Sequence, residues 1–274
     1  MSSREEPQRY CRFKADGKIY NGLVRGKMVD IVDGDIFSGF SGMRMSYPVD
    51  HLKFLPPIAP TKIWCVGRNY LGHVKELDHD VPKEPLIFMK PVTATVGSGD
   101  SVRVPEWAGR VDYEGELAAI IGRPCRKVSE ADALSYVLGY SCFNDVTARD
   151  LQTDNNWIRA KGFDGFGPLG PLILITEEMP DDARITTRLN GVAVQQDTFS
   201  NMIFSVARII SFISAFATLE PGDVIATGTP EGVGPVRGGD RVEVEIDGIG
   251  TLTNPFISDS EVTQTERSVL RILD

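Results

Sequence analysis

The stretch "RVDYEGELAAIIG" at residues 110–122 places an acidic residue at every second position, directly before an apolar run. These residues are Asp112, Glu114 and Glu116. Because side chains alternate along a β-strand, the spacing predicts a strand with three carboxylates on one face. Neighbours on that face lie about 7 Å apart and repel by roughly 2 kcal/mol at an effective dielectric constant of about 20. Another feature of the protein has to offset this repulsion.

Two explanations of the acidic face are open at this point. Water screens the charges if the face is solvated, whereas a bound cation neutralises them if it is buried. The apolar "AAIIG" indicates that the strand enters the core, and a second acidic site, Asp145 in "CFNDVTARD", also follows an apolar strand. Two glutamates and an aspartate supply oxygen ligands only, which suit Mg²⁺, Mn²⁺ or Ca²⁺ better than zinc.

Composition excludes several classes of protein. The chain has 274 residues with 42% hydrophobic residues, as in ordinary globular proteins, and a net charge of −9 without a basic run, which argues against a nucleic-acid partner. Its four cysteines form no CxxC pair, so we expect reduced thiols. The polar N-terminus lacks a signal-peptide core, and the most hydrophobic segment, 204–219, is short and contains Arg208. We therefore expect a cytoplasmic protein with no membrane partner.

The pattern of short apolar runs predicts a mainly β protein with some α-helix. Residues 9–31 read as short strands broken at hairpin-type turns, and the proline-rich "FLPPIAPTK" at 54–62 marks a boundary. We predict a small N-terminal β domain at 1–57 and a larger domain at 58–274. In the latter, β-branched runs separated by Gly and Pro favour a largely antiparallel architecture, with helices at 130–138 and 202–216.

Six motifs in series resemble the fumarylacetoacetate hydrolase family. They are "VGRNYLGHVKEL" (66–77), "PLIFMKP" (85–91), "DYEGELAAIIG" (112–122), "GYSCFNDVTARDLQ" (139–152), "AKGFDGFGPLGP" (160–171) and "GDVIATGTPEGVGP" (222–235). The resemblance implies a mixed β-sandwich roll as the large C-terminal domain, preceded by a smaller N-terminal domain.

The resemblance also implies the metal site. Glu114, Glu116 and Asp145 match the family's metal-ligand positions, and Asp112 is then a neighbour of the ligands. The implied cofactor is Mg²⁺ or Mn²⁺, with Ca²⁺ as an alternative ion.

The segment "HVKE" places His73 and Glu76 three residues apart, close enough on a short helix for the carboxylate to orient the imidazole. Such pairs are also common on protein surfaces. With the adjacent "GRNY", the resemblance favours a catalytic dyad on a lid segment that activates water or moves a proton. His51 and His79 lack such a setting and are interpreted as surface residues.

Further residues match positions that line the family's pocket and hold the carboxylate or oxo oxygen of a substrate. These residues are Lys90, Arg149, Gln152 and Lys161, and we assign a catalytic role to Lys161 because its loop contains glycine and aromatic residues. The loop "TGTPEGVGPVRGG" at 227–239 has neither of the usual nucleotide-binding spacings. The resemblance makes it a substrate-side loop in which Thr229 contacts the carboxylate.

These residues lead to a prediction of function. We expect a divalent-metal-dependent enzyme that acts on 2-oxo or 2,4-dioxo carboxylates, by hydrolysis of a C–C bond as in acylpyruvates or by decarboxylation as in oxaloacetate, through a metal-stabilised enolate. An alternative is an isomerase or decarboxylase of hydroxymuconate-type diacids in aromatic catabolism, such as 2-hydroxyhepta-2,4-diene-1,7-dioate. Rival interpretations are a non-catalytic protein that binds a metal or small molecule and a purely structural Ca²⁺ site. The resemblance to this family, whose members commonly form dimers, implies a homodimer.

Overall fold

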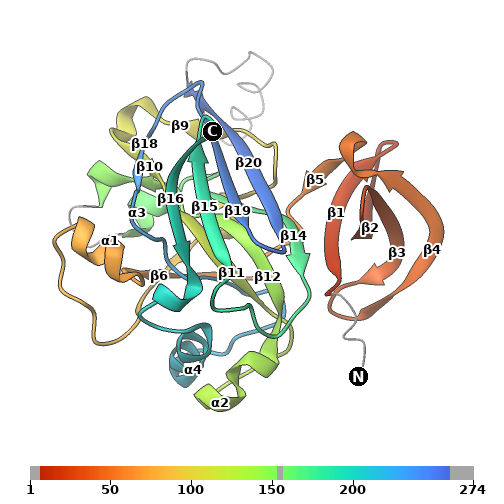
Figure 1. Cartoon of the computed structure of the whole chain (residues 1–274), viewed down its shortest axis with the longest axis horizontal. Helices are drawn as coiled ribbons and strands as arrows, with labels where there is room; N and C mark the ends of the chain where they lie inside the picture. Colours follow the sequence, from red (N-terminus) through yellow and green to blue (C-terminus); the bar gives the residue numbers. More distant parts are fainter. Residues whose placement is uncertain (1–6, 153–156, 260–274) are drawn as a thin grey trace, which may run out of the picture.

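Strands are the main regular secondary structure in the computed structural model, which describes residues 7–152 and 157–259. Figure 1 shows a small N-terminal β-module beside a larger body that contains the remaining strands and the helices. The prediction of a mainly β fold with some α-helix, arranged as a mixed sandwich roll after an N-terminal β-module, is confirmed.

The N-terminal module is an antiparallel meander, in which short turns connect β1 to β4. Its strands are β1 (Arg9–Ala15), β2 (Lys18–Arg25), β3 (Met28–Asp35), β4 (Gly39–Pro48) and β5 (Lys53–Leu55). Asp16 and Gly17 at the first turn have φ angles of 48° and 74°, as the predicted two-residue hairpin requires. Phe13 and Val29 belong to a core cluster centred on this module.

The module is joined to the main body through one strand pair. Strand β1 pairs with β14 (Gly167–Leu174) in addition to β2, so the meander continues the main sheet. The division into domains 1–57 and 58–274 stays a prediction, because this pairing places both parts in one hydrogen-bonded sheet.

The main sheet is largely antiparallel and extends from the N-terminal meander to β7. Beyond β14 its order is β12 (Val137–Asn144), β11 (Gly115–Ile121), β17 (Val224–Ala226), β6 (Ile63–Gly67) and β7 (Leu86–Lys90), and β8 (Thr95–Val96) pairs with β14 from outside this path. Strands β17 and β6 run parallel. Strands β11 and β12 are wholly or almost wholly buried, which explains why their sequences are continuous apolar runs.

A second sheet contributes to the same core as β11 and β12. It contains β16 (Val192–Thr198), β15 (Arg184–Leu189), β19 (Arg241–Ile246), β20 (Gly250–Ser258) and β9 (Val102–Val104), in that order. Leu117 and Cys142 from the main sheet share one apolar cluster with Ile185, Val244 and Leu252 from the second sheet. This shared core holds the two sheets in a sandwich.

The acidic stretch at 110–122 is two strands in two sheets, and the prediction of one continuous strand is wrong. Strand β10 (Val111–Tyr113) belongs to a small sheet with β13 (Thr147–Ala148) and β18 (Gly234–Val236), whereas β11 begins at Gly115. Glu114 lies between them, and its backbone N–H donates to the Asn144 side chain at 3.0 Å. This contact stabilises the break in the strand.

The helices are short, apart from one that packs on the core. They are α1 (Leu71–Glu76), α2 (Glu130–Ala133), α3 (Trp157–Lys161) and α4 (Val206–Phe216). Helix α4 confirms most of the helix predicted at 202–216. The helix predicted at 130–138 is too long, because the chain passes through a 3₁₀ turn and enters β12 at Val137 to pair with β11. No helix in the two described ranges has both the length and the hydropathy to span a membrane.

Candidate active site

Three buried carboxylates meet where β11 and β12 lie side by side. Glu114 and Glu116 flank the start of β11, and Asp145 directly follows β12, whose Asn144 is paired with Gly115. Each of the three carboxylates offers an oxygen that lies within 4.8 Å of the other two. The antiparallel pairing of β11 with β12 thus brings together acids that are about 30 residues apart in the chain.

The acidic face is not solvated, so the screening explanation is wrong. Asp112, Glu116 and Asp145 are each at most 1% exposed, and Glu114 is 4% exposed. Asp112 is separated from the cluster by its own partners, Nε of Arg110 at 2.7 Å and Nε of Arg149 at 2.9 Å. It is a neighbour of the three carboxylates and holds Arg149 in place.

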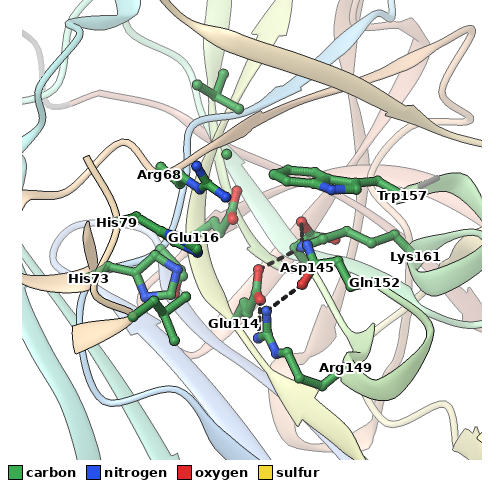
Figure 2. A pocket seen from close by; sticks show the side chains of 14 residues that line it. Arg68, His73, His79, Glu114, Glu116, Asp145, Arg149, Gln152, Trp157 and Lys161 are labelled. Carbon is green, nitrogen blue, oxygen red and sulfur yellow. Dashed lines mark hydrogen bonds and ion pairs between the residues drawn. The ribbon is translucent and has the colours of Figure 1, made fainter. Parts of the chain in front are cut away.

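Two cations that line the pocket neutralise part of the cluster. Lys161 Nζ lies 2.8 Å from Glu114 Oε2 and 2.6 Å from Asp145 Oδ2, and Arg149 Nη2 lies 2.5 Å from Glu114 Oε1. Burial disfavours ionisation of Glu114, but the charges of Lys161 and Arg149 outweigh it and lower the pKa of this carboxyl. Burial likewise opposes the charge of Lys161, whereas Asp145 and Glu114 raise its pKa above the usual value. Figure 2 shows these contacts converging on the two acids.

Glu116 is the acid that these cations leave uncompensated. Burial, followed by the charges of Asp145 and Glu114, raises the pKa of Glu116 well above its ordinary value. Its carboxylate accepts a hydrogen bond from the backbone N–H of Gly228 at 2.9 Å. Asp145 Oδ1 is also buried without a well-aligned hydrogen bond. A divalent cation fits this oxygen-rich set, because it would supply the positive charge that Glu116 lacks.

Lys90 lies elsewhere than the sequence predicts. Its side chain is fully buried, with Nζ 2.7 Å from Asp145 Oδ1 and donating to the backbone carbonyls of Val146 and Lys161. It is not among the residues that line the pocket. This position favours a structural role, in which Lys90 holds Asp145 from behind, over contact with a substrate.

His73 and Glu76 lie on α1, which covers the site. Nδ1 of His73 is 3.2 Å from Glu76 Oε2, and Glu76 Oε1 accepts a hydrogen bond from the backbone N–H of Gly232 at 3.1 Å. His73 is 5% exposed and lines the same pocket as the three carboxylates, unlike a surface pair. Because the carboxylate accepts from Nδ1–H, Nε2 is the ring nitrogen left for a ligand. Glu76 itself does not line the pocket.

Arg149, Gln152 and Thr229 line the pocket as the sequence predicts. Arg149 Nη1 donates to Gln152 Oε1 at 2.8 Å, and Thr229 donates to the carbonyl of Gly115 at 2.9 Å. Gln195 is a buried residue that sequence reasoning missed. Its amide oxygen accepts from Gly115 N–H at 3.0 Å, and its nitrogen donates to Thr229 Oγ1 at 2.8 Å. Gln195 therefore ties the start of β11 to the Thr229 loop.

Three further pocket residues were also missed. Arg68, His79 and Trp157 line the cavity, so the interpretation of His79 as an ordinary surface residue is incomplete, although it is exposed at the rim. Arg68 has a φ of 57°, a conformation that costs a residue other than glycine about 1–3 kcal/mol. The motif "GRNY" between a strand and a helix is the sequence signal for the part of the pocket that contains Arg68.

The pocket has a volume of about 240 Å³. Pockets for drug-sized ligands usually measure about 300–1,000 Å³. The site is thus suited to a compact, polar molecule.

Comparisons with known proteins identify the family. Residues 62–257 match the family model described as the C-terminal domain of fumarylacetoacetate (FAA) hydrolase, and residues 8–57 match an Rv2993c-like N-terminal model. The chain therefore belongs to the fumarylacetoacetate hydrolase family, as its motifs predict. Enzymes of this family generally depend on a divalent metal, and the three carboxylates here provide a matching set of ligands.

Individual relatives span most of the chain. An uncharacterized protein of Archaeoglobus fulgidus is 50% identical, covering 90% of this chain and 95% of the relative. A mitochondrial oxaloacetate tautomerase of Xenopus laevis is 42% identical, and the match covers 76% of this chain and 69% of the relative. The crystal structure of a 2-hydroxyhepta-2,4-diene-1,7-dioate isomerase from Mycobacterium marinum has a TM-score of 0.85 and 40% identity, covering 93% of this chain and all of that one. The tautomerase and the isomerase are enzymes.

Proposed function

We propose that this chain is a divalent-metal-dependent enzyme that acts on a compact 2-oxo or 2,4-dioxo carboxylate through its enolate, with His73 moving the proton. The observation that carries the proposal is the position of His73. Its imidazole is held by Glu76 and lines the same small pocket as three buried carboxylates. A proton-transfer group beside a cation site is what enolate chemistry needs.

Glu114, Glu116 and Asp145 would hold the ion through their carboxylate oxygens. When bound, a divalent cation supplies Lewis acidity, which polarises an oxo group and stabilises negative charge on its oxygen. Lys161 and Arg149 add fixed positive charge to the same site. Their presence also favours an anionic substrate over a neutral one.

The side chains divide the remaining work. Arg149, Gln152 and Thr229 are placed to hold the carboxylate end of the substrate. His73 accepts a proton at Nε2, either from the carbon beside the oxo group or from an attacking water. Return of the proton to another atom gives tautomerisation or isomerisation, attack of water at a 4-carbonyl gives C–C hydrolysis, and loss of a carboxylate at carbon 3 gives decarboxylation.

The small cavity favours substrates of the size of oxaloacetate, and the similarity to an oxaloacetate tautomerase supports the same choice. A second candidate is isomerisation of a longer diacid, because the similarity to the Mycobacterium marinum isomerase extends over 93% of the chain. Both candidates share the enolate and the proton transfer by His73.

The test is turnover of oxaloacetate and acetylpyruvate by the purified protein, first treated with EDTA and then supplied with Mg²⁺ or Mn²⁺. Decay of the enol absorbance of oxaloacetate without pyruvate indicates a tautomerase, pyruvate from oxaloacetate indicates a decarboxylase, and acetate and pyruvate from acetylpyruvate indicate a hydrolase. Silence on both substrates, with metal bound, would rule out the compact substrate and leave the longer diacid.

A further inference from the structure

Arg68 occupies a fixed corner of the pocket, at the end of β6. Its backbone is in the left-handed region, with φ at 57°. The neighbouring Asn69 anchors this corner, because its side chain accepts from Phe204 N–H at 2.8 Å and donates to the carbonyl of Thr227 at 2.7 Å. On the other side, the ring of Trp157 lies so close to Gly67 that a Cβ there would be 2.6 Å from it. The corner is therefore held from both sides.

Arg68 differs from the other pocket cations in its partners. Arg149 is paired with Asp112 and Glu114, and Lys161 is paired with Glu114 and Asp145. Within residues 7–152 and 157–259, no hydrogen bond or ion pair is found for the Arg68 side chain, although it is half-buried. A guanidinium has five N–H donors in a planar fork and no acceptor, so a carboxylate is its best-matched ligand.

The Arg68 guanidinium lies in the same pocket as the acidic cluster and the other cations. Figure 2 shows Arg68, His79 and His73 along one side of the acidic cluster, with Lys161 and Gln152 on the other. Burial, followed by the charge of Arg68, lowers the pKa of His79, so this imidazole is neutral near pH 7 and can donate one N–H. Because Arg149, Gln152 and Arg68 line the same pocket, a molecule held at one end by Arg149 and Gln152 can present its other end to Arg68.

We propose that Arg68 forms a second anion subsite, with His79 at its rim, that binds the distal carboxylate of a dicarboxylic 2-oxo acid. The inference rests on the proposed function, because it assumes that the Arg149 side holds the 2-oxo carboxylate. It makes Arg68 the residue that selects diacids over monoacids. An arginine that merely faces solvent would give no such selection.

Binding of three stable probes tests the subsite without turnover. They are 2-oxoglutarate, its monoacid counterpart 2-oxopentanoate, and oxalate, which is too short to reach both ends. Calorimetric titration of the Mg²⁺-loaded full-length protein should show 2-oxoglutarate binding at least tenfold more tightly than 2-oxopentanoate. Arg68→Gln should remove this preference by weakening only 2-oxoglutarate, and Arg68→Lys should keep part of it. Arg159→Gln, on the exposed face of α3, is the matched control and should change none of the affinities.

The oxalate arm separates the two proposals. Oxalate binding that depends on Mg²⁺ and survives Arg68→Gln shows that the variant is folded and that the 2-oxo-acid end is intact. A preference for 2-oxoglutarate that is absent from the wild type, or that persists in Arg68→Gln, overturns the second subsite and leaves the proposed function standing. Failure of all three probes to bind the metal-loaded wild type overturns both.

Discussion

The ammonium of Lys161 lies 2.6 Å from Oδ2 of Asp145, inside the cluster of carboxylates that would hold a divalent cation. The same nitrogen contacts Glu114 at 2.8 Å. Lys161 therefore neutralises part of the charge on two of the three acids and leaves Glu116 to a further cation. This division of charge explains how the chain folds with so many buried acids in one place.

Glu116→Gln should abolish most of the stabilisation by divalent metal. A ligand at about 100 times its Kd stabilises a folded protein by about 2.7 kcal/mol, and the variant should lose this gain because it lacks the uncompensated carboxylate. The metal-free variant should be at least as stable as the metal-free wild type, since a buried charge is removed. Thermal unfolding in EDTA and in Mg²⁺ or Mn²⁺ measures both effects. Glu106→Gln, at an exposed glutamate, is the control; an unchanged metal-induced shift in Glu116→Gln would exclude Glu116 as a ligand.

His73→Ala should lower kcat by about 10²–10⁴-fold, the usual contribution of a positioned acid–base group. Metal affinity should stay near the wild-type value, because within the described residues no hydrogen bond or ion pair joins His73 to the three carboxylates. Glu76→Gln should have a smaller effect on kcat, because it leaves the imidazole present but poorly oriented. Steady-state kinetics with a metal titration checks both variants, and unchanged turnover in His73→Ala would refute the proton-transfer role.

Lys90→Met distinguishes a structural lysine from a substrate-binding one. Removing one partner of a buried ion pair costs about 3–5 kcal/mol, and Asp145 and two carbonyls lose a donor here. We expect a large loss of unfolding free energy in urea. A variant with normal stability and a raised KM would instead support substrate contact.

Gln195→Ala should destabilise the protein by about 1–3 kcal/mol, because it leaves Gly115 N–H and the Pro230 carbonyl without their partner. Gln196 is exposed on the other face of the same strand, and Gln196→Ala should change stability by less than about 0.5 kcal/mol. Chemical denaturation of the pair measures the difference. Equal effects would show that Gln195 does not tie the Thr229 loop to β11.

Stability should fall in alkaline solution. Burial raises the pKa of Cys11 to about 12 and is the first of several causes that raise the pKa of Tyr10 to about 12. The unfolded chain ionises these groups first, so their contribution is complete below the unfolded pKa and is lost as pH rises toward 12. Urea denaturation between pH 8 and pH 11 should show the decline. Cys11→Ala should make it shallower, and an identical slope would assign the decline to other groups.

Much of the fold and the site followed from local pattern. Alternating and continuous apolar runs predicted a mainly β chain, and the ordered motifs predicted the family. The spacing of Glu114 and Glu116, with Asp145 after a second apolar strand, indicated a cluster of oxygen ligands. Such features are readable because side-chain direction repeats with the period of the secondary structure.

The tertiary structure alone decided which distant residues share the pocket. The β11–β12 register places Asp145 beside Glu114. Because the strand breaks at Glu114, Asp112 forms an ion pair with Arg149 and stays outside the cluster. Lys90 contacts Asp145 without lining the pocket, whereas Arg68 lines the pocket, although each belongs to one of the six sequence motifs. Sequence spacing fixes the face on which a side chain lies, but its neighbours depend on strand register and loop path, which are set by contacts between segments far apart in the chain.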